Sequence, residues 1–199
     1  MCRPGFNASC ALCCGSHNYD AEPLEIEKLF SKRRKIFSYY SRKYIINRIV
    51  SSRSDLTGSY YYTEEKHPFI LSKPPLHKDT LQCPYVTVVD DNITIGCYLY
   101  PEGVHGSRNL DCFNAYRSKR FLCRAMDTLT DEEVLYAARL TGDWYYYSIL
   151  IHHHSFLKKL MDEHPEPGCI DETGMIEISR ELKNHCRENR HLHNIHTYL

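Results

Sequence analysis

The stretch Tyr85-Val-Thr-Val-Val89-Asp-Asp-Asn-Ile93-Thr-Ile-Gly-Cys97-Tyr-Leu99 decides the fold of this chain. Residues 85–89 and 93–99 are rich in β-branched side chains, which favour strands, and the three residues between them have turn chemistry. This pattern predicts a β-hairpin. Cys83 precedes the first strand and Cys97 comes near the end of the second. Because the strands of a hairpin are antiparallel, we expect these two thiols to lie close together.

Helical patterns flank the hairpin. Apolar residues at mostly three- and four-residue steps predict a long helix over residues 22–50. Thr130-Asp-Glu-Glu133 is a capping box that starts a helix running to about Leu140, and Gly142 ends it. The remaining predicted segments are helices over 144–163 and 176–195, a short strand over 59–63, an irregular connection over 103–127 and a turn-rich linker over 165–174.

The predicted fold class is therefore α+β, with a small β-hairpin core that carries a cysteine metal site and is wrapped by several helices. The 199 residues fit a single domain, residues 1–199, with a helical C-terminal extension over about 128–199. A chain of this length buries enough apolar surface to fold without relying on disulfides or metals alone.

The composition limits the classes of protein to which this chain can belong. The net charge is zero, so global electrostatics predict no partner. Ten cysteines in 199 residues lie below the density of a disulfide scaffold. The N-terminus has no apolar core of a secretory signal, and no stretch reaches the ~18 apolar residues of a membrane span. We therefore expect a cytoplasmic protein with reduced thiols and no membrane partner.

The cysteines themselves indicate a metal. Cys10, Cys13 and Cys14 crowd into five residues, and thiols this close in a cytoplasmic chain typically bind metal. Zinc takes four ligands and favours thiolates, and an iron–sulfur cluster also takes four. The candidate metal ligands are Cys10, Cys13, Cys14, Cys83, Cys97, Cys112 and Cys123. Adjacent Cys13 and Cys14 reach one centre only if the chain turns sharply, which Gly15 permits.

Several alternatives stay open at this point. A free cysteine is often a small buried hydrophobe, and this is the expected role of Cys169 and Cys186. His17, three residues after Cys14, is a candidate mixed ligand. Seven thiols exceed the demand of a simple structural zinc, which slightly favours an iron–sulfur cluster. Basic residues near Cys112 and Cys123 are expected to balance the charge of such a centre, namely Arg108, Arg117, Lys119, Arg120 and Arg124.

The cysteine spacing resembles the YkgJ-type cysteine-cluster family, described as a zinc- or iron-chelating domain with a CxxCxxCC signature. Residues 7–15 match this signature except at its first cysteine, where this chain has Asn7. Cys83-Pro-Tyr resembles the later Cys-Pro-aromatic element of the family, and residues 96–101 resemble its Gly-Cys segment that leads to a proline. The resemblance covers about a quarter of the chain and implies metal binding. One branch of similar proteins comprises flagellin lysine methylases.

The functional hypothesis is a metal-binding protein that holds an iron–sulfur cluster or zinc, with a redox or protein-modifying role. Whether it is an enzyme stays open, because no catalytic residues stand out. The alternative is a non-enzymatic interaction module whose zinc holds the fold. Residues 28–53 contain nine Lys or Arg and no Asp or Glu, so a helix there could bind nucleic acid or an acidic protein. The simpler interpretation of this segment is a solvated basic face.

Overall fold

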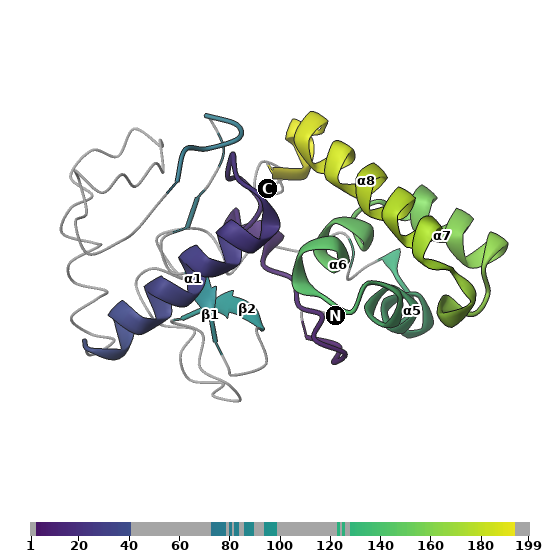
Figure 1. The fold of residues 1–199 in the computed structure, drawn as a ribbon, viewed down its shortest axis with the longest axis horizontal. Helices are drawn as coiled ribbons and strands as arrows, with labels where there is room; N and C mark the ends of the chain where they lie inside the picture. Colours follow the sequence, from purple (N-terminus) through teal and green to yellow (C-terminus); the bar gives the residue numbers. More distant parts are fainter. Residues whose placement is uncertain are drawn as a thin grey trace.

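The computed structural model describes residues 3–40, 73–78, 80, 82–83, 86–89, 94–98, 123, 125 and 128–193, except for the side chain of Cys97. Its elements are α1 (Pro23–Ser38), β1 (Val86–Val88), β2 (Ile95–Cys97), α5 (Asp131–Thr141), α6 (Trp144–Leu150), α7 (His154–Glu163) and α8 (Glu172–Glu188), with 3-10 turns η1 (Leu12–Cys14), η4 (Pro167–Cys169) and η5 (Arg190–His193). Helix α1 and the hairpin lie on one side of the molecule, and α5–α8 lie on the other (Figure 1). The predicted α+β class is confirmed.

The predicted hairpin forms. Strands β1 and β2 pair antiparallel, with Val86 opposite Cys97 and Val88 opposite Ile95. The backbone of Cys97 therefore lies opposite a residue only three positions after Cys83. Helix α1 covers β1, and the Thr87 hydroxyl donates a hydrogen bond of 2.9 Å to the carbonyl of Phe30. The predicted turn and the strand at 59–63 lie outside the described residues.

Helix α1 is shorter than the sequence predicts. It begins at Pro23, where a missing N–H costs nothing, and Glu25 accepts a hydrogen bond from the Glu22 N–H at 3.2 Å. The prediction of helix at positions 39 and 40 is wrong. The N–H groups of both residues bond to carbonyls three positions back, so the last turn is tightened. Residues 41–50 lie outside the described part.

The predictions for the C-terminal helices succeed where caps are explicit. Thr130 Oγ1 accepts from the Glu133 N–H at 3.2 Å, and the Thr130 N–H donates to the Glu133 carboxylate at 2.7 Å. Gly142 has a φ of 60° and closes α5 in the left-handed region, as expected of a C-cap glycine.

The single helix predicted over 144–163 is wrong, since the structure has two. The N–H groups of His152 and His153 bond to carbonyls three residues back, which ends α6 in a tight turn. Ile151 is fully buried at this turn, so the core holds the chain where it changes direction. Helix α8 starts earlier than predicted because Asp171 caps it, accepting from the Gly174 N–H at 2.8 Å. It also ends earlier, at Glu188.

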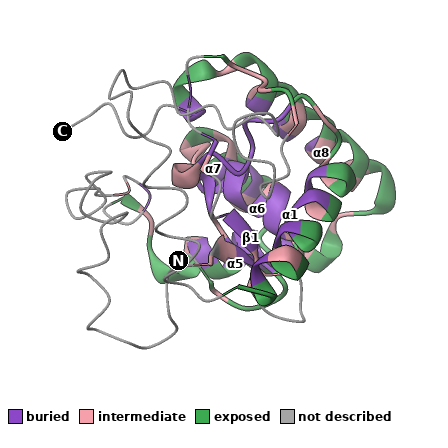
Figure 2. Ribbon diagram, turned by 90° about the vertical axis from the view of Figure 1, so that its left-hand side faces the viewer, coloured by how far each residue is buried: buried purple, intermediate pink, exposed green. Residues whose placement is uncertain are grey.

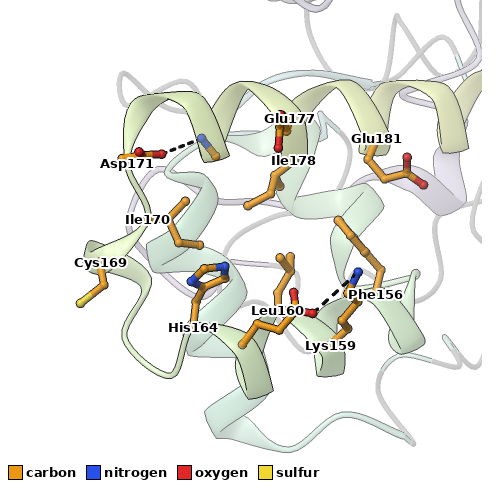
Figure 3. Close-up of a pocket in the computed structure, with 12 residues that line it drawn as sticks. Phe156, Lys159, Leu160, His164, Cys169, Ile170, Asp171, Glu177, Ile178 and Glu181 are labelled. Atoms are coloured by element: carbon orange, nitrogen blue, oxygen red, sulfur yellow. Dashed lines mark hydrogen bonds and ion pairs between the residues drawn. The ribbon is translucent and has the colours of Figure 1, made fainter.

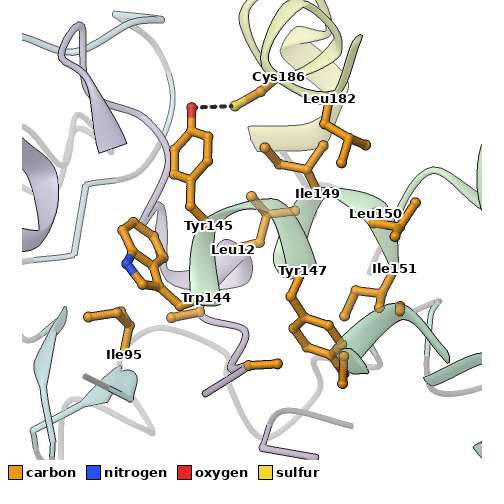
Figure 4. Packing of buried hydrophobic residues seen from close by; sticks show 14 of the residues in the cluster. Leu12, Ile95, Trp144, Tyr145, Tyr147, Ile149, Leu150, Ile151, Leu182 and Cys186 are labelled. Atoms are coloured by element: carbon orange, nitrogen blue, oxygen red, sulfur yellow. Dashed lines mark hydrogen bonds between the residues drawn. The ribbon is translucent and has the colours of Figure 1, made fainter. Parts of the chain in front are cut away.

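Helix α6 is the centre of the core. Figure 2 shows it buried among the other elements, and Tyr147, Ile149 and Leu150 are fully buried. One cluster of buried residues includes side chains from the N-terminal loop, α1, both strands and α5–α8. Figure 4 shows the Tyr145 hydroxyl directed at Cys186, with a donor–acceptor distance of 3.7 Å. Among the described helices, none combines the length and apolar character needed to cross a bilayer.

The N-cap of α6 makes stability depend on pH. Asp143 accepts a hydrogen bond from the Tyr146 N–H at 2.8 Å, but burial raises the pKa of its carboxyl group to about 6, and the charge of Glu27 adds to this. The folded state therefore favours the protonated acid. The stability from this group is present below pH 4 and is lost as the pH rises through 6.

We predict that Asp143→Asn stabilises the protein at pH 8 by about 1 to 2 kcal/mol, because asparagine keeps the cap and removes a desolvated charge. The gain should vanish at pH 4. Urea unfolding at both pH values measures the change. The matched control is Asp171→Asn, which alters an exposed cap of the same kind. An equal gain at both pH values would contradict the prediction.

Candidate functional site

The cysteine loop, residues 8–18, makes the sharp turn that the sequence requires. The Cys14 N–H donates to the Ala11 carbonyl at 2.9 Å, and the Gly15 N–H donates to the Leu12 carbonyl at 2.8 Å. Gly15 has a φ of 71°, which an L-residue rarely adopts. The result is that the sulfur atoms of Cys13 and Cys14 lie 3.9 Å apart.

Cys83 joins this pair from the hairpin side. Its N–H donates to the Cys14 carbonyl at 3.0 Å, which ties the residues before β1 to the cysteine loop. Hydrogen bonds with the thiols of Cys13 and Cys83 raise the pKa of Cys14 well above its usual value. The hydrogen bond from Cys14 lowers the pKa of Cys13, against burial and the nearby Cys83 sulfur. Cys13, Cys14 and Cys83 are here called the thiol trio, and the opposite shifts in pKa mean that the Cys13 thiol ionises before the Cys14 thiol.

A buried cation hydrogen-bonds the backbone of Cys83. Arg33 on α1 is only 1% exposed, and its Nη1 donates to the carbonyls of Cys83 at 3.4 Å and Val86 at 3.2 Å. Its guanidinium also lies over the rings of Tyr19 and Phe30, at 5.7 and 5.4 Å from their centroids. A buried positive charge therefore lies beside the backbone of one member of the thiol trio.

The other predicted ligands are placed differently. Cys10 is half-buried and packs against the core. The Cys123 sulfur lies 3.4 Å from His152 Nε2. Cys112 and the side chain of Cys97 are outside the described residues, as are the five basic residues predicted to balance the centre. Of the two cysteines expected to be buried, Cys186 is, but Cys169 is exposed, so that prediction is wrong for Cys169.

His17 has a structural role rather than that of a mixed ligand. Its Nε2–H donates to the Tyr145 carbonyl at 2.9 Å, and Nδ1 bonds to the Ser16 hydroxyl at 2.8 Å. Both ring nitrogens are therefore occupied. Burial lowers the pKa of His17 to about 3, so the ring is neutral near pH 7.

The thiol trio can be tested against the dimensions of a metal centre. Two thiolates on one tetrahedral zinc are separated by about 3.8 Å, given Zn–S bonds of about 2.3 Å. The 3.9 Å between Cys13 and Cys14 fits this edge. Within the described residues, however, no group of three or more Cys, His, Asp or Glu side chains is already arranged to hold a metal ion. The sulfur atoms would need to close further around an ion.

Asn7, at the first position of the resembled signature, lies in an exposed turn with a φ of 59°. The Ala8 N–H closes this turn by donating to the Gly5 carbonyl at 2.9 Å. Asparagine tolerates the left-handed region better than most side chains. Position 7 therefore belongs to the exposed start of the loop rather than to its buried part.

A groove of about 730 Å³ lies between α7 and α8 (Figure 3). Leu160, Ile170 and Ile178 line it together with Glu177 and Glu181. None of its lining residues comes from the cysteine loop or the hairpin. The groove is therefore separate from the thiol trio.

Comparison of the chain with protein families, with curated proteins and with solved structures finds no match. The resemblance to cysteine-cluster proteins therefore stays a prediction.

The sequence did not predict a role for two residues of this region, Arg33 and His152. Arg33 falls in the apolar stripe of α1, between Phe30 and Phe37 at helical spacing, and a cation at such a position signals a buried charge. His152 carries no comparable signal, because its partner Cys123 is 29 residues away.

We predict that the loop is sensitive to acid through His17. Its folded pKa lies below the usual 6.5, so the unfolded chain takes up a proton that the folded protein excludes. Stability is then full above pH 6.5 and falls, by up to about 1.4 kcal/mol per pH unit, as the pH drops toward 3. His17→Gln should lower stability at pH 8 but flatten this slope, as measured by urea unfolding from pH 8 to 5. Exposed His191→Gln is the control, and an unchanged slope in His17→Gln would contradict the assignment.

Proposed function

We propose that this protein binds a metal through the thiolates of Cys13, Cys14 and Cys83. The observation that carries the proposal is the thiol trio itself, in which two segments about 70 residues apart bring the Cys14 thiol within hydrogen-bonding reach of both Cys13 and Cys83. Cys10 and Cys97 are the candidates for the fourth ligand. Among the described cysteines outside Cys97, no disulfide joins one to another, which fits the reducing cytoplasmic location that we propose.

Arg33 supports the same proposal through charge. Three or four thiolates around a divalent ion leave net negative charge, and such a centre is stable in a buried site only if the charge is balanced. The guanidinium donates a hydrogen bond to the backbone carbonyl of Cys83, which is itself a proposed ligand. It is thus placed to offset thiolate charge through the protein interior.

The geometry favours zinc over the iron–sulfur cluster that the thiol count favoured. In a [4Fe–4S] cluster each thiolate binds a different iron, so neighbouring ligand sulfur atoms lie farther apart than on a single ion. A separation of 3.9 Å between Cys13 and Cys14 suits two ligands of one tetrahedral ion. We therefore propose a zinc that ties the cysteine loop to the hairpin. A [2Fe–2S] cluster with both cysteines on one iron is the competing centre.

The test is the metal content of anaerobically purified protein. We expect about one zinc per chain, with Cys14→Ser and Cys83→Ser each losing most of it because each removes one of four ligands. The control is exposed Cys169→Ser, which should keep its zinc. A brown protein that contains iron and sulfide would show that the centre is an iron–sulfur cluster rather than zinc. Folded wild-type protein without any metal would contradict metal binding altogether.

A second function is supported by the exposed face of α1. Lys28, Lys32 and Lys35 are exposed at helical positions i, i+4 and i+7, so they form one basic stripe. Tyr39 follows the helix and is 75% exposed. Cations beside an exposed aromatic ring suit a nucleic-acid strand, and the cations alone suit an acidic protein. Arg33 does not belong to this face, because it is buried.

We predict that Lys32→Glu/Lys35→Glu weakens binding of a fluorescent single-stranded oligonucleotide at least about tenfold and lowers its salt dependence. The matched control is Lys158→Glu/Arg180→Glu, which makes the same charge change at exposed positions on α7 and α8. Fluorescence anisotropy at several salt concentrations measures both. Equal losses in the two variants, or binding that is independent of salt, would exclude a nucleic-acid role. Competition by polyglutamate alone would instead indicate an acidic protein partner.

A further inference from the structure

Cys123 and His152 form a thiol–imidazole pair apart from the thiol trio. Their Sγ and Nε2 atoms lie 3.4 Å apart, within hydrogen-bond distance for sulfur. On the other side of the ring, Nδ1 lies 2.8 Å from the Ser148 carbonyl. Because a carbonyl oxygen only accepts, Nδ1 carries the proton and Nε2 presents its lone pair to the thiol.

The group that orients this histidine is itself held firmly. Ser148 is fully buried in α6, and its hydroxyl lies 2.8 Å from the Trp144 carbonyl and 3.0 Å from the Ser9 carbonyl. The ring of His152 is therefore positioned by a rigid part of the core. A nucleophile, a base and a group that orients the base are the three parts of an activated nucleophile.

We propose that Cys123 is a nucleophilic thiol, that His152 is its general base, and that the pair undergoes exchange with small disulfides. The thiol of Cys123 gives its proton to His152 Nε2 as its sulfur attacks one sulfur of the disulfide. A new S–S bond forms to Cys123 while the S–S bond of the substrate breaks. The leaving thiolate takes the proton from His152, so the products are a mixed disulfide and a free thiol, and no further reagent is needed.

A disulfide is the substrate class that this pair fits best. Exchange needs a nucleophile and an acid for the leaving sulfur, and Cys123 and His152 supply both. Cys123 is half-buried, which admits a small disulfide at its exposed side. The thiol exchange does not depend on the proposed metal, because it is carried by Cys123, His152 and Ser148, none of which belongs to the thiol trio.

The test compares Cys123 with a thiol in the same chain. Wild-type protein is treated with oxidised glutathione at pH 7, quenched at intervals and mapped by mass spectrometry. Exposed Cys169, at the turn η4, is the internal reference. We expect Cys123 to form its mixed disulfide at least about tenfold faster than Cys169 although Cys169 is more exposed.

Variants then show whether the reactivity of Cys123 comes from His152 or from other features of its surroundings. His152→Gln should slow Cys123 about tenfold and leave Cys169 unchanged, whereas His154→Gln, two residues along, should leave both rates unchanged. If His152→Gln fails to fold by circular dichroism, the wild-type comparison of the two thiols decides alone. The metal content of the same samples is measured in parallel, so that the exchange reaction and the proposed metal site are tested separately. Three results would each overturn the proposal. They are a rate of mixed-disulfide formation at Cys123 no higher than that at Cys169, a Cys123 rate that does not change in His152→Gln, and reactivity of Cys123 that appears only after a bound metal is chelated.

Discussion

The fold depends on satisfying the polar backbone of a loop that lies inside the protein. Residues 8–18 are mostly buried, and buried N–H and C=O groups without partners are costly. The partners come from distant parts of the chain. Ser9 Oγ accepts from the Ile95 N–H of the hairpin at 2.9 Å, and His17 donates to the Tyr145 carbonyl of α6. The loop thus joins the two sides of the molecule, and the thiol trio lies where these hydrogen bonds hold it.

Much of this architecture was predictable because short stretches of sequence determine it. The hairpin follows from two β-branched segments around a turn, and α5 follows from the Thr130 cap and Gly142. The C-terminal end of α1 and the break between α6 and α7 were not predictable in the same way. The buried Ile151 directs the chain after α6, and no cap residue in the sequence marks that break.

The candidate site shows the same division. The turn at Gly15 makes the contact of Cys13 and Cys14 predictable from five residues, but the hydrogen bond that ties Cys83 to Cys14 joins segments about 70 residues apart and has no local signal. The sequence analysis treated Arg33 only as one of the cations of a basic segment, although its position in the apolar stripe of α1 distinguishes it from the others. The contact of Cys123 with His152 depends on how α6 ends, so no local pattern predicts it.

The contacts of the loop also bear on the order of events during synthesis. His17 bonds a residue 128 positions later, and the Ser9 carbonyl accepts from one 139 positions later. Pairings of such long sequence separation form late. The N-terminal cysteines therefore leave the ribosome well before the helix that encloses them exists. For that interval they are open to metal donors, oxidants and chaperones, and the nascent chain rather than the finished protein is the form most exposed to all three.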